Sequence, residues 1–138
     1  MSFKSKLAKT LAFGTLALES CVTMTSRQKA NLMELQMYGV DTQEKKKVDP
    51  FFAGLLNVGP GLGNFYLASS GEESMQWPIG VFNLLLWYPS VVWSIPEAYI
   101  DAGRINQKTT IDHYFEGPGK PLLENLRAEY AERVRGKK

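Results

Sequence analysis

Two long apolar stretches occupy the middle of the chain, and polar sequence lies on both sides of them. The first runs from residue 51 to 68 and the second from 77 to 100, with the polar turn Ser-Ser-Gly-Glu-Glu-Ser at 69–74 between them. Neither stretch shows the strict alternation of apolar and polar residues that is typical of a half-buried strand. The pattern therefore predicts an all-α protein in which residues 51–101 form an apolar helical hairpin, inserted into a membrane or packed on one.

Glycine and proline interrupt both stretches. In the first, Pro60 stands among several glycines and should kink the helix, because proline removes a backbone donor. Such residues are better tolerated in membranes, where small residues let helices approach closely. The second stretch is long enough to reach across a bilayer, which needs about 20 residues, although Pro89 and Pro96 should bend it. Trp77 and Trp93 suit membrane–water interfaces.

The polar flanks predict two further helices. Residues 21–50 are expected to form a polar tether with a short helix that starts near Ser26 and stops at Gly39. Residues 102–138 are expected to form a polar loop, with a loop or a short helical turn at 106–113, followed by an amphipathic helix. That helix should dock on the hairpin, on a partner or on lipid headgroups, with docking inside the same protein favoured. Its docking stripe consists of residues at four-residue intervals: Leu122, Leu126, Tyr130 and Val134.

The first 20 residues have the three parts of a secretion signal. Lys4, Lys6 and Lys9 make a basic start, and the apolar run at 11–18 is too short to span a bilayer. Small Ser20 then precedes Cys21, the only cysteine of the chain. A basic region, a short apolar core and a small residue before the cut define a secretory signal. With cysteine directly after the cut, Leu18-Glu19-Ser20-Cys21 resembles the lipobox of bacterial lipoproteins, although Glu19 departs from the usual small or apolar residue.

This resemblance implies cleavage between Ser20 and Cys21 and a covalent lipid, such as palmitate, on Cys21. Two or more acyl chains hold a protein stably at a membrane. The chain would then be anchored at the periplasmic or external face of a bacterial membrane. Val22 follows the cysteine where family members kept at the inner membrane tend to carry aspartate, so an outer-membrane location in a host with two membranes is compatible with the sequence.

A second resemblance concerns residues 51–101, which are similar to small domains of two transmembrane helices. In that family, glycines precede an aromatic pair at the end of the first helix, and an acid closes the second helix. Here the glycines are Gly59, Gly61 and Gly63, for which close helix packing is expected. The aromatic pair is Phe65 and Tyr66, and the closing acid is Asp101. Asn64 stands where the family usually has a basic residue.

The two resemblances disagree about orientation. Lys45–Lys47 precede the hairpin and Arg104 and Lys108 follow it, so the excess of positive charge near both ends places them in the cytoplasm. A lipid on Cys21 would lie on the opposite face, and residues 22–50 contain nothing able to cross a membrane. Three resolutions remain: the signal is not cleaved as expected, the charge rule fails, or the hairpin is not a true span. The last is favoured, with a hairpin that inserts only partly or that a partner protein covers.

Charge and chemistry exclude several classes of function. Removal of residues 1–20 leaves 13 basic and 13 acidic groups, so nothing favours nucleic-acid binding. The single histidine, His113, and its neighbouring acids have no metal-ligand spacing, and no catalytic motif is present. Glu97 and Asp101 lie on one helical face near the expected membrane interface, where acids are functional candidates. Their alternative is to face water or to bind Arg104.

The sequence therefore predicts a non-enzymatic lipoprotein of the bacterial cell envelope, with no cofactor other than the lipid on Cys21. Its expected contacts are membrane lipid and another envelope protein, because large aromatic side chains dominate interface energetics. The aromatic residues proposed for this surface are Trp77, Trp87, Tyr88 and Trp93. One alternative is an integral inner-membrane hairpin that modulates a channel, transporter or motor complex. Another is a phage-encoded lipoprotein that masks a host receptor.

Overall fold

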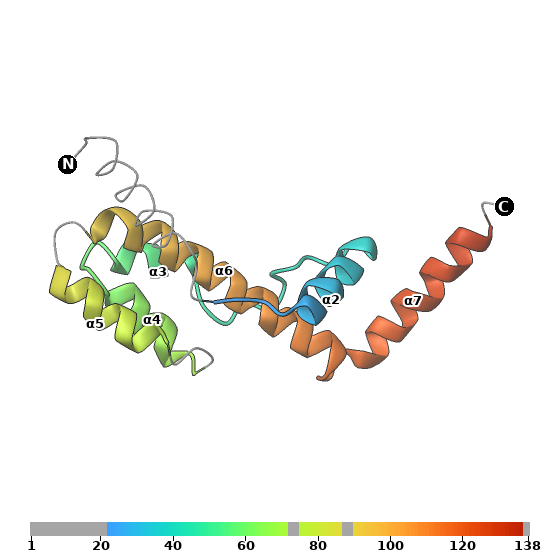
Figure 1. The fold of residues 1–138 in the computed structure, drawn as a ribbon. Helices are drawn as coiled ribbons and strands as arrows, with labels where there is room; N and C mark the ends of the chain where they lie inside the picture. The colour runs from blue at the N-terminus through green and yellow to red at the C-terminus, as the bar shows by residue number, and fades with distance from the viewer. Residues whose placement is uncertain (1–21, 72–74, 87–89, 137–138) are drawn as a thin grey trace, which may run out of the picture. The chain divides into compact units, whose positions relative to one another are not determined.

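The computed structural model describes residues 22–71, 75–86 and 90–136 (Figure 1). These residues form α-helices and contain no strand, so the predicted all-α class is confirmed for the described part of the chain. The helices are α2 (Ser26–Met37), α3 (Pro50–Leu56), α4 (Leu62–Ser69), α5 (Gln76–Leu86), α6 (Val91–Phe115) and α7 (Lys120–Arg135).

The chain divides into two compact units. The first unit contains residues 49–102 together with residues 22 and 23 of the described chain, and the second contains 24–48 and 103–138. Helix α6 contributes its first part to the first unit and its remainder to the second.

The first unit contains more helices than the predicted two-helix hairpin. Asp49 caps α3 by accepting from the Phe52 amide at 2.9 Å, and Pro50 occupies the first turn, where a missing donor costs nothing. The chain then turns through Gly61, whose φ of 85° is left-handed, before α4 starts. The first apolar stretch is therefore split into α3 and α4, and the second is divided between α5 and α6. Among the described residues, no helix combines the length and the hydropathy that crossing a bilayer requires.

Residues 24–48 do not form a free tether. Thr25 and Gln28 make reciprocal cap hydrogen bonds at the start of α2, and Gly39, with φ 77°, follows its end. The predicted short helix is thus confirmed, but its Leu35 is fully buried. It belongs to the core of the second unit, which consists of Leu35, Ile111, Tyr114 and Leu123. Packing of this apolar side is what holds a helix that would be marginal by itself.

The loop predicted at residues 106–113 is wrong, because α6 continues through it to Phe115. Two polar side chains of this stretch, Asn106 and Thr110, are buried and bind the backbone of residues 45–48. The Asn106 carboxamide oxygen accepts from the amides of Lys47 and Val48 at 2.8 and 3.1 Å, and its nitrogen donates to the Val48 carbonyl at 2.9 Å. Thr110 accepts from the Lys45 amide at 3.2 Å. These side chains satisfy an irregular segment that has no secondary structure to do so.

The four-residue stripe predicted on α7 is not the face that packs within the second unit, and its docking on a partner or on lipid headgroups stays a prediction. Leu122, Tyr130 and Val134 are exposed, whereas Leu123 is buried in the core of the second unit. A step of four residues advances about 40° beyond a full helical turn, so such a stripe winds off any fixed contact face. The face that packs includes Leu123 and Arg127. Tyr130 contributes through its ring, whose centroid lies 5.5 Å from the centroid of the Tyr38 ring.

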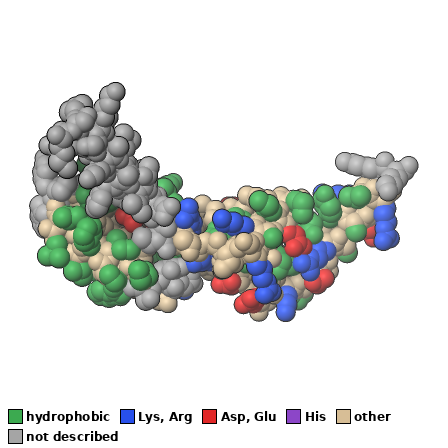
Figure 2. All heavy atoms as spheres, in the orientation of Figure 1, with side chains coloured by type: hydrophobic (Ala, Val, Ile, Leu, Met, Phe, Trp, Pro, Cys, Tyr) green, Lys and Arg blue, Asp and Glu red, His purple; other side chains and the backbone are tan. Residues whose placement is uncertain are grey.

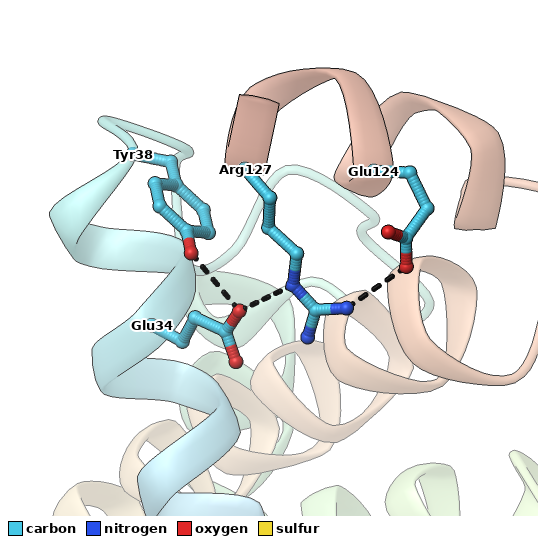
Figure 3. A network of polar contacts seen from close by, with 4 residues as sticks. All are labelled: Glu34, Tyr38, Glu124 and Arg127. Atoms are coloured by element: carbon cyan, nitrogen blue, oxygen red, sulfur yellow. Dashed lines mark hydrogen bonds and ion pairs between the residues drawn. The ribbon is translucent and has the colours of Figure 1, made fainter. Parts of the chain in front are cut away.

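A polar network joins α2 and α7 on this face (Figure 3). The Arg127 guanidinium donates to Glu34 at 2.7 Å and to Glu124 at 2.9 Å, and the Tyr38 hydroxyl donates to the same Glu34 oxygen at 3.1 Å. The hydrogen bond from Arg127 lowers the pKa of Glu34 below its ordinary value of 4.5, although desolvation opposes the shift. The ionised Glu34 carboxylate therefore helps to hold α7 on α2.

We expect acid to loosen the contact of α7 with α2. Because the pKa of Glu34 is lowered in the folded chain, its contribution is complete above about pH 4.5 and is lost as the pH falls through the folded pKa. Partly exposed pairs of this kind contribute about 0.2–1 kcal/mol. Hydrogen exchange of α7 peptides, followed by mass spectrometry as the pH falls, should show this loss, after correction for intrinsic exchange rates.

The Glu34→Gln variant should lose part of that acid dependence, and Glu129→Gln should keep it, because Glu129 pairs with Arg133 at 3.6 Å on the exposed side of α7. Some dependence should remain in Glu34→Gln, since the pKa of Glu44 is also lowered, chiefly by its bond to Lys45 and then by Tyr114. An acid response identical to that of the unchanged chain would show that Glu34 does not carry it.

Candidate functional site

The interior of the first unit is unusually polar. Its fully buried side chains include four carboxamides, one carboxylate and two hydroxyls, namely Asn57, Asn64, Gln76, Asn83, Asp101, Ser90 and Ser94. The buried apolar residues of the same unit are few and mostly small: Val22, Ala53, Leu67, Ala68, Ala98 and Ala102. Most soluble domains of this size have the reverse composition inside.

Asn64, on α4, lies at the centre of the buried polar network. Its side-chain oxygen accepts from the Asn57 and Asn83 amides, each at 3.2 Å, and its nitrogen donates to Gln76 at 2.8 Å. The Asn57 nitrogen also donates to the Ser94 carbonyl at 2.7 Å. One side chain thus joins α4 to α3 and α5, and through Asn57 to α6.

Two branches lead outward from this centre. On one, the Gln76 amide donates to Asp101 at 2.5 Å, and the backbone amide of Val22 donates to the other Asp101 oxygen at 3.3 Å. On the other, the Trp93 indole donates to Asn83 at 3.1 Å. Among the described residues, the Ser94 hydroxyl is the one buried side-chain polar atom without a partner. The network is therefore almost fully satisfied, as a buried polar core must be to be stable.

The glycines of the predicted packing motif let the helices of the first unit approach closely. A Cβ on Gly61 would collide with the Gly80 carbonyl, and a Cβ on Gly63 with the Ala53 carbonyl and the Asn57 side chain. At Gly59 it would meet only the flexible end of Leu62, at 2.7 Å. The aromatic pair packs outward from the same region, with Phe65 5.2 Å from Trp77 and Tyr66 5.3 Å from Phe52 between ring centroids. No phosphate-binding role is needed to explain these glycines.

The exterior of the first unit is apolar. Figure 2 shows hydrophobic side chains gathered on this unit with no Lys or Arg among them. Leu85 is 78% exposed, Val92 80% and Phe51 72%. The other large apolar residues exposed on this unit are Phe52, Leu55, Val58, Leu62, Met75, Trp77, Val81, Phe82, Leu84, Leu86, Tyr99 and Ile100.

Part of this exterior is a groove of about 490 Å³ between α3 and α6. Every residue that lines it is apolar or aromatic: Phe51, Gly54, Leu55, Val58, Ile95, Pro96, Tyr99 and Ile100. Such a lining offers no charged group to a ligand and suits a partner without hydrogen-bonding needs. We treat the groove as part of the same apolar exterior.

Charge is segregated between the two units. All Lys and Arg residues after residue 20 belong to residues 24–48 or 103–138, and residues 49–102 contain none. The first unit therefore has no cation with which to attract anionic headgroups, nucleic acid or acidic peptides. Its exterior can make contacts only through the hydrophobic effect and its few polar atoms.

The predicted site residues fall into three groups. Ser20, Cys21, Trp87 and Tyr88 lie outside the described residues, as does the predicted signal at 1–20. Trp77 is 55% exposed on the apolar exterior, whereas Trp93 is partly buried and bonded to Asn83. Glu97 and Asp101, which the sequence places near a membrane interface, are both buried in the first unit, so the alternative that they face water is wrong.

Sequence reasoning missed Gln76 and did not join the asparagines into one network. A signal exists in the spacing: Gln76 and Asn83 stand seven residues apart in an otherwise apolar run, which places them on one face of α5. Within the described residues there is no cluster of three or more His, Cys, Asp or Glu side chains arranged to hold a metal ion. His113 packs against Gly119 and the ring of Tyr114.

Comparisons of the chain with models of known protein families, with curated proteins and with solved structures find no match. The polar interior, the apolar exterior and the sequence signal therefore carry the functional argument by themselves.

Proposed function

We propose that the chain is a lipid-anchored protein of the bacterial cell envelope, held by acyl chains on Cys21, with the first unit resting in the lipid of the same membrane face or against an apolar surface of another envelope protein. In this proposal it has a structural or interaction role and no catalytic one. The observation that carries the proposal is the inverted composition of the first unit, with amides inside and large apolar side chains outside.

The physical argument rests on what surrounds a folded unit. In water, fully burying an apolar side chain of Leu or Phe size is worth about 1.5–3 kcal/mol, so a sequence with this many of them should place them inside. Monomers in water rarely expose contiguous apolar patches larger than a few hundred Å². In an apolar environment the preference reverses, because unpaired amides become costly while exposed Leu and Phe do not. The first unit, with its amides buried and its large apolar side chains exposed, fits an apolar environment better than water.

The second unit supports the same arrangement. It carries all the cations of the mature chain, pairs several of its charges at its surface and has an apolar core of ordinary type. Such a unit is stable in water. The chain thus combines a part suited to lipid or to an apolar partner surface with a part suited to the aqueous side.

Replacing Cys21 with alanine should abolish acylation and signal cleavage at this site. The protein as made in a bacterial host would be extracted from membranes with detergent and its intact mass measured. We expect the unchanged chain to lack residues 1–20 and to carry the mass of at least two acyl chains, and the Cys21→Ala chain to show neither change. Because Cys21 is the only cysteine, a thiol-reactive label gives an independent readout: it should not react with the processed chain.

The matched control is Ser5→Ala, a substitution between the signal's lysines that leaves the lipobox untouched. It should leave cleavage and acylation as they are. An unmodified full-length mass for the unchanged chain, together with a freely reactive thiol, would contradict the proposed lipid anchor. The lipid anchor would be contradicted equally if the Cys21→Ala chain had the mass of the unchanged chain, apart from the substitution itself, and stayed in the same membrane fraction.

A further inference from the structure

A buried carboxylate in the first unit holds the residue that follows the lipid-bearing cysteine. In the full-length chain, with residues 1–20 still attached, Val22 and Asp101 are both fully buried, and the Val22 amide donates to Asp101 at 3.3 Å. They are separated by 79 positions in the sequence. A fully buried backbone amide and its side chain this close to a mature N-terminus are unexpected, since chain ends are usually poorly ordered unless something fixes them.

The fixation extends into the polar network. The second Asp101 oxygen accepts from Gln76, and Gln76 in turn accepts from Asn64. Gln76 and Asn64 are themselves fully buried. Asn64 orients the Gln76 side chain, and Gln76 in turn orients the Asp101 carboxylate. The direction of the Asp101 oxygen that binds Val22 is therefore fixed. A carboxylate removed from water needs such partners, because desolvating it alone is very costly.

We infer that Asp101 is a positioning residue that clamps Val22 onto the first unit, so that the acyl chains on Cys21 and the apolar exterior of this unit enter the same membrane leaflet. The inference rests on the proposed lipid anchor. Its reason is covalent: consecutive Cα atoms lie about 3.8 Å apart, so no spacer separates the acylated residue from the clamped one. The first unit cannot be held away from the membrane on a flexible tether.

The test uses the full-length, acylated protein with ¹⁵N-labelled valine in phosphatidylcholine nanodiscs. Its first readout is the exchange rate of the Val22 amide with solvent, relative to the rate for an unprotected amide. We expect the Val22 amide to exchange at least about tenfold more slowly than an unprotected one, and Asp101→Ala to remove this protection. The internal control is Val48, whose amide is held in the same way, by the Asn106 oxygen at 3.1 Å, but in the second unit. It should stay protected in both proteins.

The second readout uses lipids with a spin label in the acyl chain. We expect the label to broaden the amide signals of Val81 and Val92, both exposed on the first unit. A sharp Val92 signal in the acylated protein would overturn the shared leaflet.

Fast exchange of the Val22 amide in the unchanged acylated protein would overturn the clamp. This outcome needs no variant, so the inference can be tested even if Asp101→Ala does not fold. Slow exchange that persists in a folded Asp101→Ala protein would overturn the role of Asp101. The intact mass of the same sample separates the two proposals. A chain without acyl groups contradicts the lipid anchor, whereas an acylated chain with an unprotected Val22 contradicts only the clamp.

Discussion

Replacing Gly61 with alanine should unfold or severely destabilise the first unit. The φ of 85° at this position is left-handed, which costs an L-residue about 1–2 kcal/mol. The new Cβ would also collide with the backbone carbonyl of Gly80 on α5, and inserting an atom into packed structure costs about 1–3 kcal/mol more. Backbone cannot move aside as a flexible side chain can, so we expect a loss of about 3 kcal/mol or more.

Urea unfolding in mild detergent, followed by tryptophan fluorescence, measures this loss. All three tryptophans lie within residues 49–102, so their fluorescence reports the first unit alone. Gly71→Ala is the matched control: its φ of 80° is equally left-handed, but nothing lies within 4 Å of the added Cβ. It should show only the conformational cost. Equal losses for the two variants would mean that the contact between Gly61 and Gly80 contributes nothing to stability.

Replacing Asn64 with alanine should have an effect of similar size for a different reason. The substitution removes the acceptor of the Asn57 and Asn83 amides and the donor to Gln76. Each buried polar group left without a partner costs about 1–3 kcal/mol. Asn57 keeps its bond to the Ser94 carbonyl, so the total should be about 3 kcal/mol rather than the full sum.

The same fluorescence measurement applies, with Ser69→Ala as the control. Ser69 lies at the exposed end of α4 and donates only to the nearby Tyr66 carbonyl, so its loss should stay within about 0.5 kcal/mol. A loss below about 1 kcal/mol for Asn64→Ala would show that the orphaned amides find other partners, and that the network does not organise the interior.

The features that follow local rules could be predicted from the sequence. Thr25 precedes α2 and pairs with Gln28 in its first turn, and Gly39 follows the end of the helix. Each of these signals depends only on residues close by in the sequence. The sequence Gly59-Pro60-Gly61 indicates the break in the first apolar stretch. That the break yields two helices instead of one kinked helix depends on the close packing of Gly61 against the Gly80 backbone. The presence of a helix after the polar loop was also predicted, and α7 begins at Lys120, within the Gly-Pro-Gly-Lys-Pro break.

The errors occurred where distant segments decide the structure. Residues 106–113 look like a loop because their polar side chains have no local use. Their use is to bind the backbone of residues 45–48, almost 60 positions earlier. Likewise, Glu97 and Asp101 were placed near a membrane interface, with water as an alternative. Both are buried instead, and Asp101 binds residues 22 and 76, which are distant in the sequence.

The sequence by itself determined the all-helical class, the concentration of apolar residues between 51 and 100 and the expectation of a lipid on Cys21, because composition, helix-breaking residues and a signal pattern act locally. Only the tertiary structure decided that the apolar residues of the first unit face outward while its amides face inward. Hydrophobic periodicity indicates that choice only weakly, because the runs are almost entirely apolar and only the spacing of Gln76 and Asn83 marks a polar face. A few amides orient the helices by bonding to one another across them, and those bonds exist only once the helices are packed.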